Sequence, residues 1–286
     1  MLNEEQLNFY KDKGYIILDD VISMLDLKYI KDSLNAVLDA IADRAKLEYP
    51  SYPEKFESTD NISKKMNFLE ELDHKFIAEF HDSMQTANNP YVAKLISSEK
   101  ILNYVNFLLG ETPHNPLFMT SSMGIFSMPN NIEHTVNQWH TDTFYTCKDG
   151  HYVHVWAPII EDSSEDIGSL RILPGSHKEP FKGEMRDSSN QISDIHKFVI
   201  SKKFVEKYDE IVITAKKGQV VFFNQYLVHR GGLNISDRTR FGLVTLYHSM
   251  SNLKFTPYYL QHPKSLLTSD DFFDEVMLKK THNDKN

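Results

Sequence analysis

The chain has a single cysteine, Cys147, among its 286 residues. One thiol cannot form an intramolecular disulfide, so the sequence predicts a protein of a reducing compartment whose fold depends on a buried core. The sequence also lacks any apolar run of about 18 residues, and the N-terminus carries Asn3, Glu4 and Glu5 where a signal peptide would need basic and apolar residues. We therefore expect a cytoplasmic protein with no membrane-spanning segment.

Basic residues are the scarcer charge, with 31 Lys and Arg against 40 Asp and Glu and a net charge of −9. A nucleic-acid-binding surface needs clustered positive charge, so nucleic acid is excluded as the main partner. The oligomeric state is not defined by the sequence.

Helical patterns fill the first 110 or so residues. Asn3 is predicted to cap a short helix that Gly14 ends, and residues 15–18 are typical of a strand. Ser23 is predicted to cap a long helix with an apolar stripe formed by Leu27, Ile30, Leu34, Val37, Leu38 and Ile41. Further helices are predicted near 62–84 and over 98–110, and without repeats or linkers we expect these helices to buttress a sheet.

Strand patterns dominate the remainder of the chain. Residues 152–157 and 240–247 are rich in β-branched and aromatic side chains. Residues 211–215 and 220–223 flank a turn in which Gly218 supplies a positive φ, which predicts a β-hairpin. In the strand that begins at Arg240, alternation places Arg240, Gly242, Val244 and Leu246 on one face.

One chemical motif stands out, His140-Thr141-Asp142. Residues 137–145 are predicted to be extended, so Gln138, His140 and Asp142 should emerge on one face, whereas on a helix His140 and Asp142 would diverge by about 200°. A second His-x-Asp, His282-Asn283-Asp284, lies in a polar tail and is interpreted as a chance match, because 13 histidines make about one such match expected. Taken alone, the first copy also fits a half-buried His beside a surface Asp.

His229 supplies the missing third ligand type. Two imidazoles and one carboxylate form the set that holds ferrous iron on one face and leaves the opposite positions open for co-substrate and dioxygen. His229 lies 87 residues after Asp142 (229 minus 142), so their segments must be neighbours in space if one ion binds both. A double-sheet jelly roll brings distant strands together around a pocket in this way.

These residues resemble the phytanoyl-CoA dioxygenase-like branch of the iron(II)/2-oxoglutarate oxygenases, which includes ectoine hydroxylase. The His140–Asp142 segment, the loop at 168–178 and the spacing from His229 to Arg240 carry the resemblance, and residues 2–18 extend it to the N-terminus. The resemblance implies an all-β core with helices (α+β), namely a cupin-like double-stranded β-helix, or jelly roll, buttressed by N-terminal helices. We expect a single oxygenase domain over 1–275, with a helical part at 1–110, the jelly-roll core at 111–255, an extension at 256–275 and a flexible tail at 276–286.

The resemblance also implies site residues and a reaction. His140, Asp142 and His229 match the iron ligands, Arg240 matches the residue that binds the distal carboxylate of 2-oxoglutarate, and Trp156 matches an aromatic residue near that co-substrate. The implied cofactors are Fe(II), 2-oxoglutarate and O2, and the implied reaction hydroxylates an aliphatic C–H of a small molecule with release of succinate and CO2. Because Asp142 is a carboxylate where related halogenases have Ala or Gly, hydroxylation is favoured over halogenation.

The sequence departs from the family pattern at Gly231, where a Ser is common two residues after the distal His. Co-substrate binding is therefore expected to be weaker or supported by another residue. A CoA ester is disfavoured by the acidic composition unless Lys178, Lys182 and Arg186 form a basic patch. A non-catalytic jelly-roll ligand-binding module, or a cupin-type metalloenzyme that does not use 2-oxoglutarate, is the alternative interpretation.

Further hypotheses concern other polar residues. Substrate contacts are assigned to Gln138, Tyr145 and Arg171, with a hydrogen bond to a metal ligand as the equal alternative for Gln138. His151 and His154 are three apart in a strand and should point to opposite faces rather than form a second metal pair. His248 is expected to have a structural or substrate-pocket role, and Arg238 to be solvated or paired with a neighbour such as Asp237.

Overall fold

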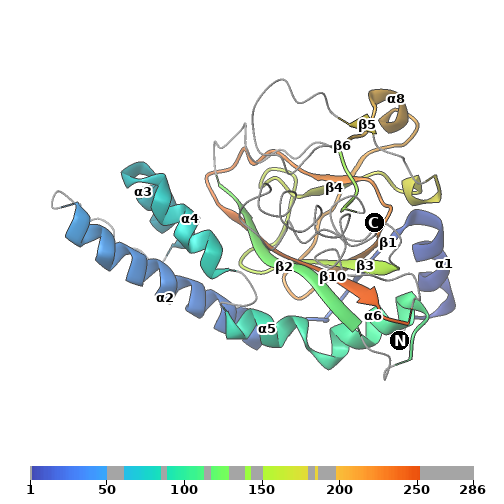
Figure 1. Ribbon diagram of the computed structural model, residues 1–286, viewed down its shortest axis with the longest axis horizontal. Helices are drawn as coiled ribbons and strands as arrows, with labels where there is room; N and C mark the ends of the chain where they lie inside the picture. The colour runs from blue at the N-terminus through green and yellow to red at the C-terminus, as the bar shows by residue number, and fades with distance from the viewer. Residues whose placement is uncertain are drawn as a thin grey trace, which may run out of the picture.

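Helices and antiparallel sheets make up the fold of the computed structural model (Figure 1). Most of the helices lie in the N-terminal part of the chain and most of the strands in the rest, as the sequence predicts. The structure describes residues 2–49, 61–84, 89–112, 117–128, 139–142, 151–179, 184–185 and 198–251.

The first two helices begin and end where their capping residues predict. In α1 (Glu4–Lys13) Asn3 and Gln6 form a reciprocal capping box, and Gly14 ends the helix at φ 82°. A short strand, β1 (Tyr15–Leu18), follows. In α2 (Met24–Glu48) the Ser23 hydroxyl accepts a hydrogen bond from the backbone of Asp26, and the predicted apolar stripe is buried apart from the partly buried Val37.

The helix predicted over 62–84 is wrong as a single element. Asp73 adopts an extended conformation at φ −167°, which ends α3 (Ile62–Leu72), and its carboxylate then caps α4 (His74–Ser83) by accepting from the backbone of Lys75. The short Asp73 side chain accepts a hydrogen bond from a nearby backbone N–H and so favours a helix N-terminus over a helix interior. One helix therefore ends at this residue and a second helix begins.

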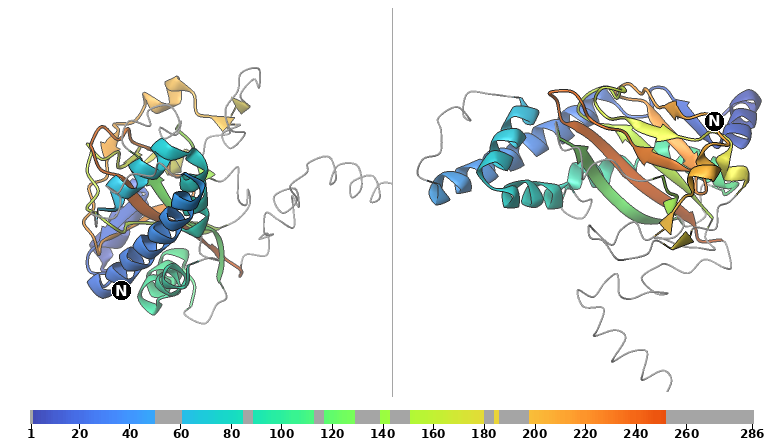
Figure 2. Two further views of the ribbon diagram at one scale, coloured as in Figure 1. Left: turned by 90° about the vertical axis from the view of Figure 1, so that its left-hand side faces the viewer. Right: turned by 90° about the horizontal axis from the view of Figure 1, so that it is seen from above.

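Two further helices complete the helical part. α5 (Pro90–Ile96), which the sequence analysis did not predict, begins with a proline and is capped by Asn89. α6 (Glu99–Leu109) is the predicted third helix and ends at Gly110. In Figures 1 and 2, α2, α3 and α4 lie together to one side of the sheets.

The larger sheet has the order β1-β8-β3-β10-β2 within the described residues. Its other strands are β2 (Leu117–Ser127), β3 (Tyr152–Pro158), β8 (Val220–Asn224) and β10 (Arg240–Ser249). Alternation gives this sheet two faces. The outer face packs against the helices through Val153, Val155, Ala157, Val220, Phe222, Phe241, Leu243 and Tyr247.

The inner face of the larger sheet packs against a smaller sheet of order β7-β4-β9. Its strands are β4 (Leu170–Ile172), β7 (Ile211–Val212) and β9 (His229–Gly231). The apolar layer between the two sheets is formed by Trp156, Leu170, Ile172, Ile213, Ala215, Val221, Phe223 and Leu227, with Tyr15, Ile17, Ile211 and Val244 beside it. The two sheets therefore enclose a common interior.

The remaining elements are short and lie near the smaller sheet. A 3-10 helix, η3 (Ser176–Lys178), packs His177 against Gly14 at the end of α1, where His177 Nε2 donates a hydrogen bond to the carbonyl oxygen of Lys11 at 3.1 Å. β5 (Glu184–Met185) pairs with β6 (Phe198–Val199), and α8 (Lys202–Val205) follows them.

The hairpin predicted for 211–223 is wrong. β7 pairs with β4 of the smaller sheet, whereas β8 pairs with β1 and β3 of the larger one. Both segments bury apolar side chains, Ile213 and Val221, in the same interior but from opposite sheets. The predicted turn is present, with Gly218 at φ 92°, and it carries the chain from one sheet to the other.

A membrane-spanning helix is absent from the described part of the chain, because none of its helices combines sufficient length with sufficient apolar character.

We predict that Gly218→Ala destabilises the protein by about 1–2 kcal/mol, because an L residue is strained at φ 92° and its Cβ would lie 3.2 Å from the carbonyl oxygen of Ile22. Urea unfolding measures the change. Gly110→Ala is the control, because Gly110 also has a positive φ of 68° but a Cβ there meets nothing within 4 Å. A Gly218→Ala variant as stable as the parent would contradict this account of the turn.

Candidate metal centre

A backbone bridge brings the two predicted histidine ligands together. The N–H of His140 donates to the carbonyl of His229 at 3.0 Å, and the N–H of His229 donates to the carbonyl of His140 at 3.0 Å. Residues that exchange both hydrogen bonds in an antiparallel pair project their side chains to the same face. Accordingly, the centroids of the two imidazole rings are only 4.5 Å apart.

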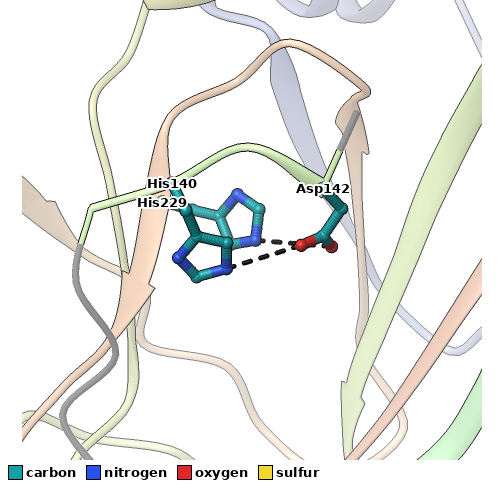
Figure 3. Close-up of side chains that lie close together, drawn as sticks. All are labelled: His140, Asp142 and His229. Atoms are coloured by element: carbon teal, nitrogen blue, oxygen red, sulfur yellow. Dashed lines mark ion pairs between the residues drawn. The ribbon is translucent and has the colours of Figure 1, made fainter. Parts of the chain in front are cut away.

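Asp142 completes the group. Its Oδ1 lies 3.5 Å from His140 Nε2 and its Oδ2 lies 3.8 Å from His229 Nε2 (Figure 3). One ligand atom from each of the three residues lies within 4.8 Å of the other two. Both histidines are 6% exposed, whereas the Asp142 side chain is 22% exposed, so the group is mostly buried but reaches solvent through Asp142. Within the described residues no other group of three His, Cys, Asp or Glu side chains meets this condition.

The strand predicted over 137–145 is not present in its described part, residues 139–142. His140 forms an isolated bridge, and Asp142 lies outside any strand. The convergence that the sequence analysis predicted is nevertheless observed for His140 and Asp142. Gln138 and Tyr145 lie outside the described residues, so their assignment to the substrate stays a prediction.

The hydrogen bond made by the far nitrogen of His229 orients its ring. His229 Nδ1 lies 2.9 Å from the carbonyl oxygen of Leu227, which can only accept, so Nδ1 carries the proton. The lone pair of Nε2 is then directed toward Asp142 and His140. A metal-ligating histidine usually has its ring fixed by a carbonyl or carboxylate in this way.

Arg240 is a buried cation at the start of β10. Its side chain is 7% exposed, and Nη1 donates to the carbonyl of Gly168 at 2.7 Å. Glycine is needed at 168 because φ is 76° and a Cβ would lie 2.8 Å from the carbonyl oxygen of Gly232. Burial lowers the pKa of Arg240 to about 10, so the guanidinium remains charged at neutral pH.

No carboxylate of the described residues pairs with this guanidinium, and its Nε is buried without a hydrogen-bond partner there. Trp156 also has a buried donor without a partner. It lies between the two sheets, and its indole Nε1–H has no acceptor in the described part of the chain. Buried donors are rarely left unpaired, because each costs about 1–3 kcal/mol. An anionic ligand with several acceptor oxygens would satisfy such donors.

Two further histidines lie on the inner face of the larger sheet. Burial lowers the pKa of His154 to about 3, although Asp142 opposes the shift, and burial lowers the pKa of His248 to about 4. Both imidazoles are therefore neutral at neutral pH. His154 Nδ1 lies 3.4 Å from Asp142 Oδ2, while His151 contacts the carbonyl of Leu109 on the helical side.

The prediction that His151 and His154 point to opposite sides is thus confirmed, but the approach of His154 to Asp142 was missed. The alternation that puts His154 on the same face as Trp156 was the available signal, because Trp156 was already expected near the co-substrate.

Arg171 lies on the other face of the smaller sheet. It is paired with Arg230 in the β4–β9 ladder, whereas its neighbour Ile172 is paired with His229. The Arg171 guanidinium forms ion pairs with Glu165 and Glu210. A substrate contact at Arg171 stays a prediction, but the described contacts direct this side chain away from His229.

Arg230 and Arg238 also have identifiable partners. Arg230 shares Glu210 with Arg171, and its guanidinium lies 4.6 Å from the ring centroid of Trp139. Arg238 pairs with Glu161 at 2.8 Å and with Asp166 at 3.1 Å, rather than with the adjacent Asp237 named from the sequence. These acidic partners come from the 161–166 segment, which Arg238 holds against the turn.

Comparison with known proteins places this geometry in context. Residues 10–242 match the family described as Phytanoyl-CoA dioxygenase (PhyH). Phytanoyl-CoA dioxygenase domain-containing protein 1 of Danio rerio is 23% identical over 273 residues, covering 88% of this chain and 91% of the relative.

Solved structures show a similar fold. EctD from S. alaskensis, solved with 2-oxoglutarate and 5-hydroxyectoine, superposes with a TM-score of 0.57 at 18% identity, covering 88% of this chain and 77% of EctD. The epimerase SnoN, solved with Fe3+, alpha ketoglutarate and nogalamycin RO, superposes with a TM-score of 0.55 at 14% identity, covering 86% of this chain and 83% of SnoN.

The family match runs from the end of α1 to the start of β10, so it includes His140, Asp142, His229 and Arg240, and it spans most of the 286 residues. The protein belongs to the phytanoyl-CoA dioxygenase (PhyH) family.

Proposed function

We propose that this protein is an iron(II)- and 2-oxoglutarate-dependent dioxygenase that hydroxylates an aliphatic C–H bond of a small molecule. The observation that carries the proposal is the convergence of His140, Asp142 and His229 within 4.8 Å of one another. The same fold buries the cation Arg240, which has no acidic partner among the described residues. We further propose that the two facing sheets form a double-stranded β-helix, and that residues 1–275 form one oxygenase domain.

In this proposal His140, Asp142 and His229 hold ferrous iron. Two neutral imidazoles and one carboxylate suit this metal and leave adjacent positions open. When bound, iron and 2-oxoglutarate supply the oxidising power by which O2 is split between a hydroxylated substrate and succinate, with release of CO2. The protein contributes orientation: the bond from His229 to Leu227 keeps Nε2 free to ligate.

Arg240 and Trp156 are the proposed co-substrate contacts. A guanidinium can donate two parallel hydrogen bonds to the distal carboxylate and stays charged at working pH. The hydrogen bond from Nη1 to the Gly168 carbonyl fixes the position of the guanidinium. Arg240 Nε and the indole Nε1–H of Trp156, which have no acceptor among the described residues, supply further donors. Burial strengthens the attraction because few waters compete.

We also propose a substrate class. Asp142 leaves no ligand position for a halide, which supports oxygen transfer. Of the basic residues considered for a CoA ester, Lys178 is already paired with Asp12, while Lys182 and Arg186 lie outside the described residues. A small molecule without the phosphates of CoA is therefore the substrate we favour.

The function is tested by anaerobic titration and by turnover. Fe(II) followed by 2-oxoglutarate should produce a weak visible charge-transfer band, and oxygen should then release succinate when a metabolite panel includes the substrate. His140→Ala and His229→Ala should abolish the band while leaving the fold intact by circular dichroism. Metal binding without the band would support a cupin-type enzyme instead, and no metal binding would support a ligand-binding module.

Arg240→Ala should weaken 2-oxoglutarate binding by on the order of 2–4 kcal/mol, or roughly 30- to 700-fold, while leaving metal binding unchanged. The charge-transfer band measures the apparent Kd. Arg238→Ala is the matched control, because Arg238 lies two residues away but pairs with Glu161 and Asp166. Equal 2-oxoglutarate affinity in the parent and in Arg240→Ala would remove Arg240 from the site.

Gly231 offers a second test of co-substrate binding. Gly231 is paired with the buried Leu170 and lies two residues after His229 in β9, so a side chain there would share the face of His229. Gly231→Ser should tighten 2-oxoglutarate binding by about 1 kcal/mol, or roughly fivefold, through one added hydroxyl donor. Gly231→Ala is the control, and an equal gain in both variants would show that the hydroxyl makes no such bond.

A further inference from the structure

A third imidazole lies against the proposed iron ligands. His154, in the middle of β3, is 0% exposed. Its ring stacks on Phe223 with the centroids 4.4 Å apart and the planes at 9°, and it lies edge-on to His229 with the centroids 5.5 Å apart. Tyr152 packs beside it at 5.3 Å between centroids. The ring is therefore held in one orientation by neighbours on its own sheet and by His229.

The His154 ring has one charged neighbour in the described part of the chain. Nδ1 lies 3.4 Å from Asp142 Oδ2, and no other carboxylate is within ion-pair distance of the ring there. Neither ring nitrogen has a well-aligned hydrogen bond in the described residues. A neutral imidazole carries one N–H, and burying that donor without an acceptor is costly. Placing the proton on Nδ1 directs it at the carboxylate, which is the better acceptor.

The other two imidazoles cannot serve this purpose once a metal is bound. His140 Nε2 and His229 Nε2 lie 3.5 Å and 3.8 Å from the carboxylate oxygens, but both nitrogens must then direct their lone pairs at the ion. His154, whose ring is not among the three that converge within 4.8 Å, keeps its proton.

We propose that His154 is a positioning residue that donates a hydrogen bond from Nδ1–H to Oδ2 of Asp142, so that the carboxylate binds the metal through Oδ1 alone. This inference rests on the proposed function. A carboxylate can bind a metal through one oxygen or through both. An Asp142 that used both oxygens would occupy one of the positions that 2-oxoglutarate and oxygen require. Engaging Oδ2 in a hydrogen bond keeps that position open.

The test compares two substitutions that remove the ring but differ in one donor. The amide of Asn can occupy the place of Nδ1, so His154→Asn retains a donor toward Asp142, whereas His154→Leu has none. Both lose the stack on Phe223. We expect His154→Leu to bind Co2+ about 10- to 100-fold more weakly than the parent, the loss typical for a partner of a metal ligand, and His154→Asn to bind within about threefold of the parent. Titration of EDTA-treated protein, followed by the visible absorption of Co2+, measures this without turnover.

Thermal unfolding separates positioning from packing. In the absence of metal, both variants should have a lower Tm than the parent, because both lose the ring. Only His154→Leu should also lose most of the rise in Tm that Co2+ produces. Equal losses of Co2+ affinity in the two variants would show that His154 acts through packing alone and would overturn the inference.

A double-mutant cycle supplies the second readout. In an Asp142→Asn background the proposed acceptor is changed, so adding His154→Leu should weaken Co2+ binding by less than about threefold. Additive losses would overturn the inference. A parent that binds Co2+ and loses it in His140→Ala, while His154→Leu binds normally, would leave the proposed function standing and the inference refuted. A parent that binds no Co2+ would overturn both.

Discussion

The site depends on one pair of reciprocal backbone hydrogen bonds, between His140 and His229. This bridge joins two segments far apart in the sequence, and its geometry places both imidazoles on the same face with their centroids 4.5 Å apart. His229 is itself aligned by the β4–β9 ladder, where it is paired with Ile172. Asp142 needs no strand of its own, because it follows His140 closely enough to reach both rings.

The interior between the two sheets buries several polar groups. Most of its described lining is apolar, and the polar groups there include the three converging residues, His154, His248, and the donors of Arg240 and Trp156. Leaving such donors without acceptors lowers the stability of the protein by itself. In the proposed function a bound dicarboxylate would satisfy them. Functional sites commonly include groups that lower stability, and the rest of the fold compensates for them.

Local chemistry accounts for the parts of the fold that the sequence predicted. Asn3 and Ser23 cap their helices, Gly14 and Gly218 take positive φ, and the alternation in β3 and β10 separates inner from outer faces. The errors arose where two local patterns compete or where pairing is not local. Asp73 interrupts a helical pattern because its carboxylate serves as a cap. The strands on either side of Gly218 join different sheets because each finds its partners elsewhere in the chain.

The sequence by itself determined the candidate ligand types, the face that Arg240 shares with Val244 in its strand, and the family resemblance, because residue type and period-two alternation are local properties. Only the tertiary structure decided that His140 faces His229, that Arg171 is directed to the opposite side of β4, and that His154 reaches Asp142. These depend on which strands become neighbours. Which strands pair is set by how the two sheets bury their apolar faces against each other. A local stretch of sequence does not encode this packing, because the paired strands lie far apart in the chain.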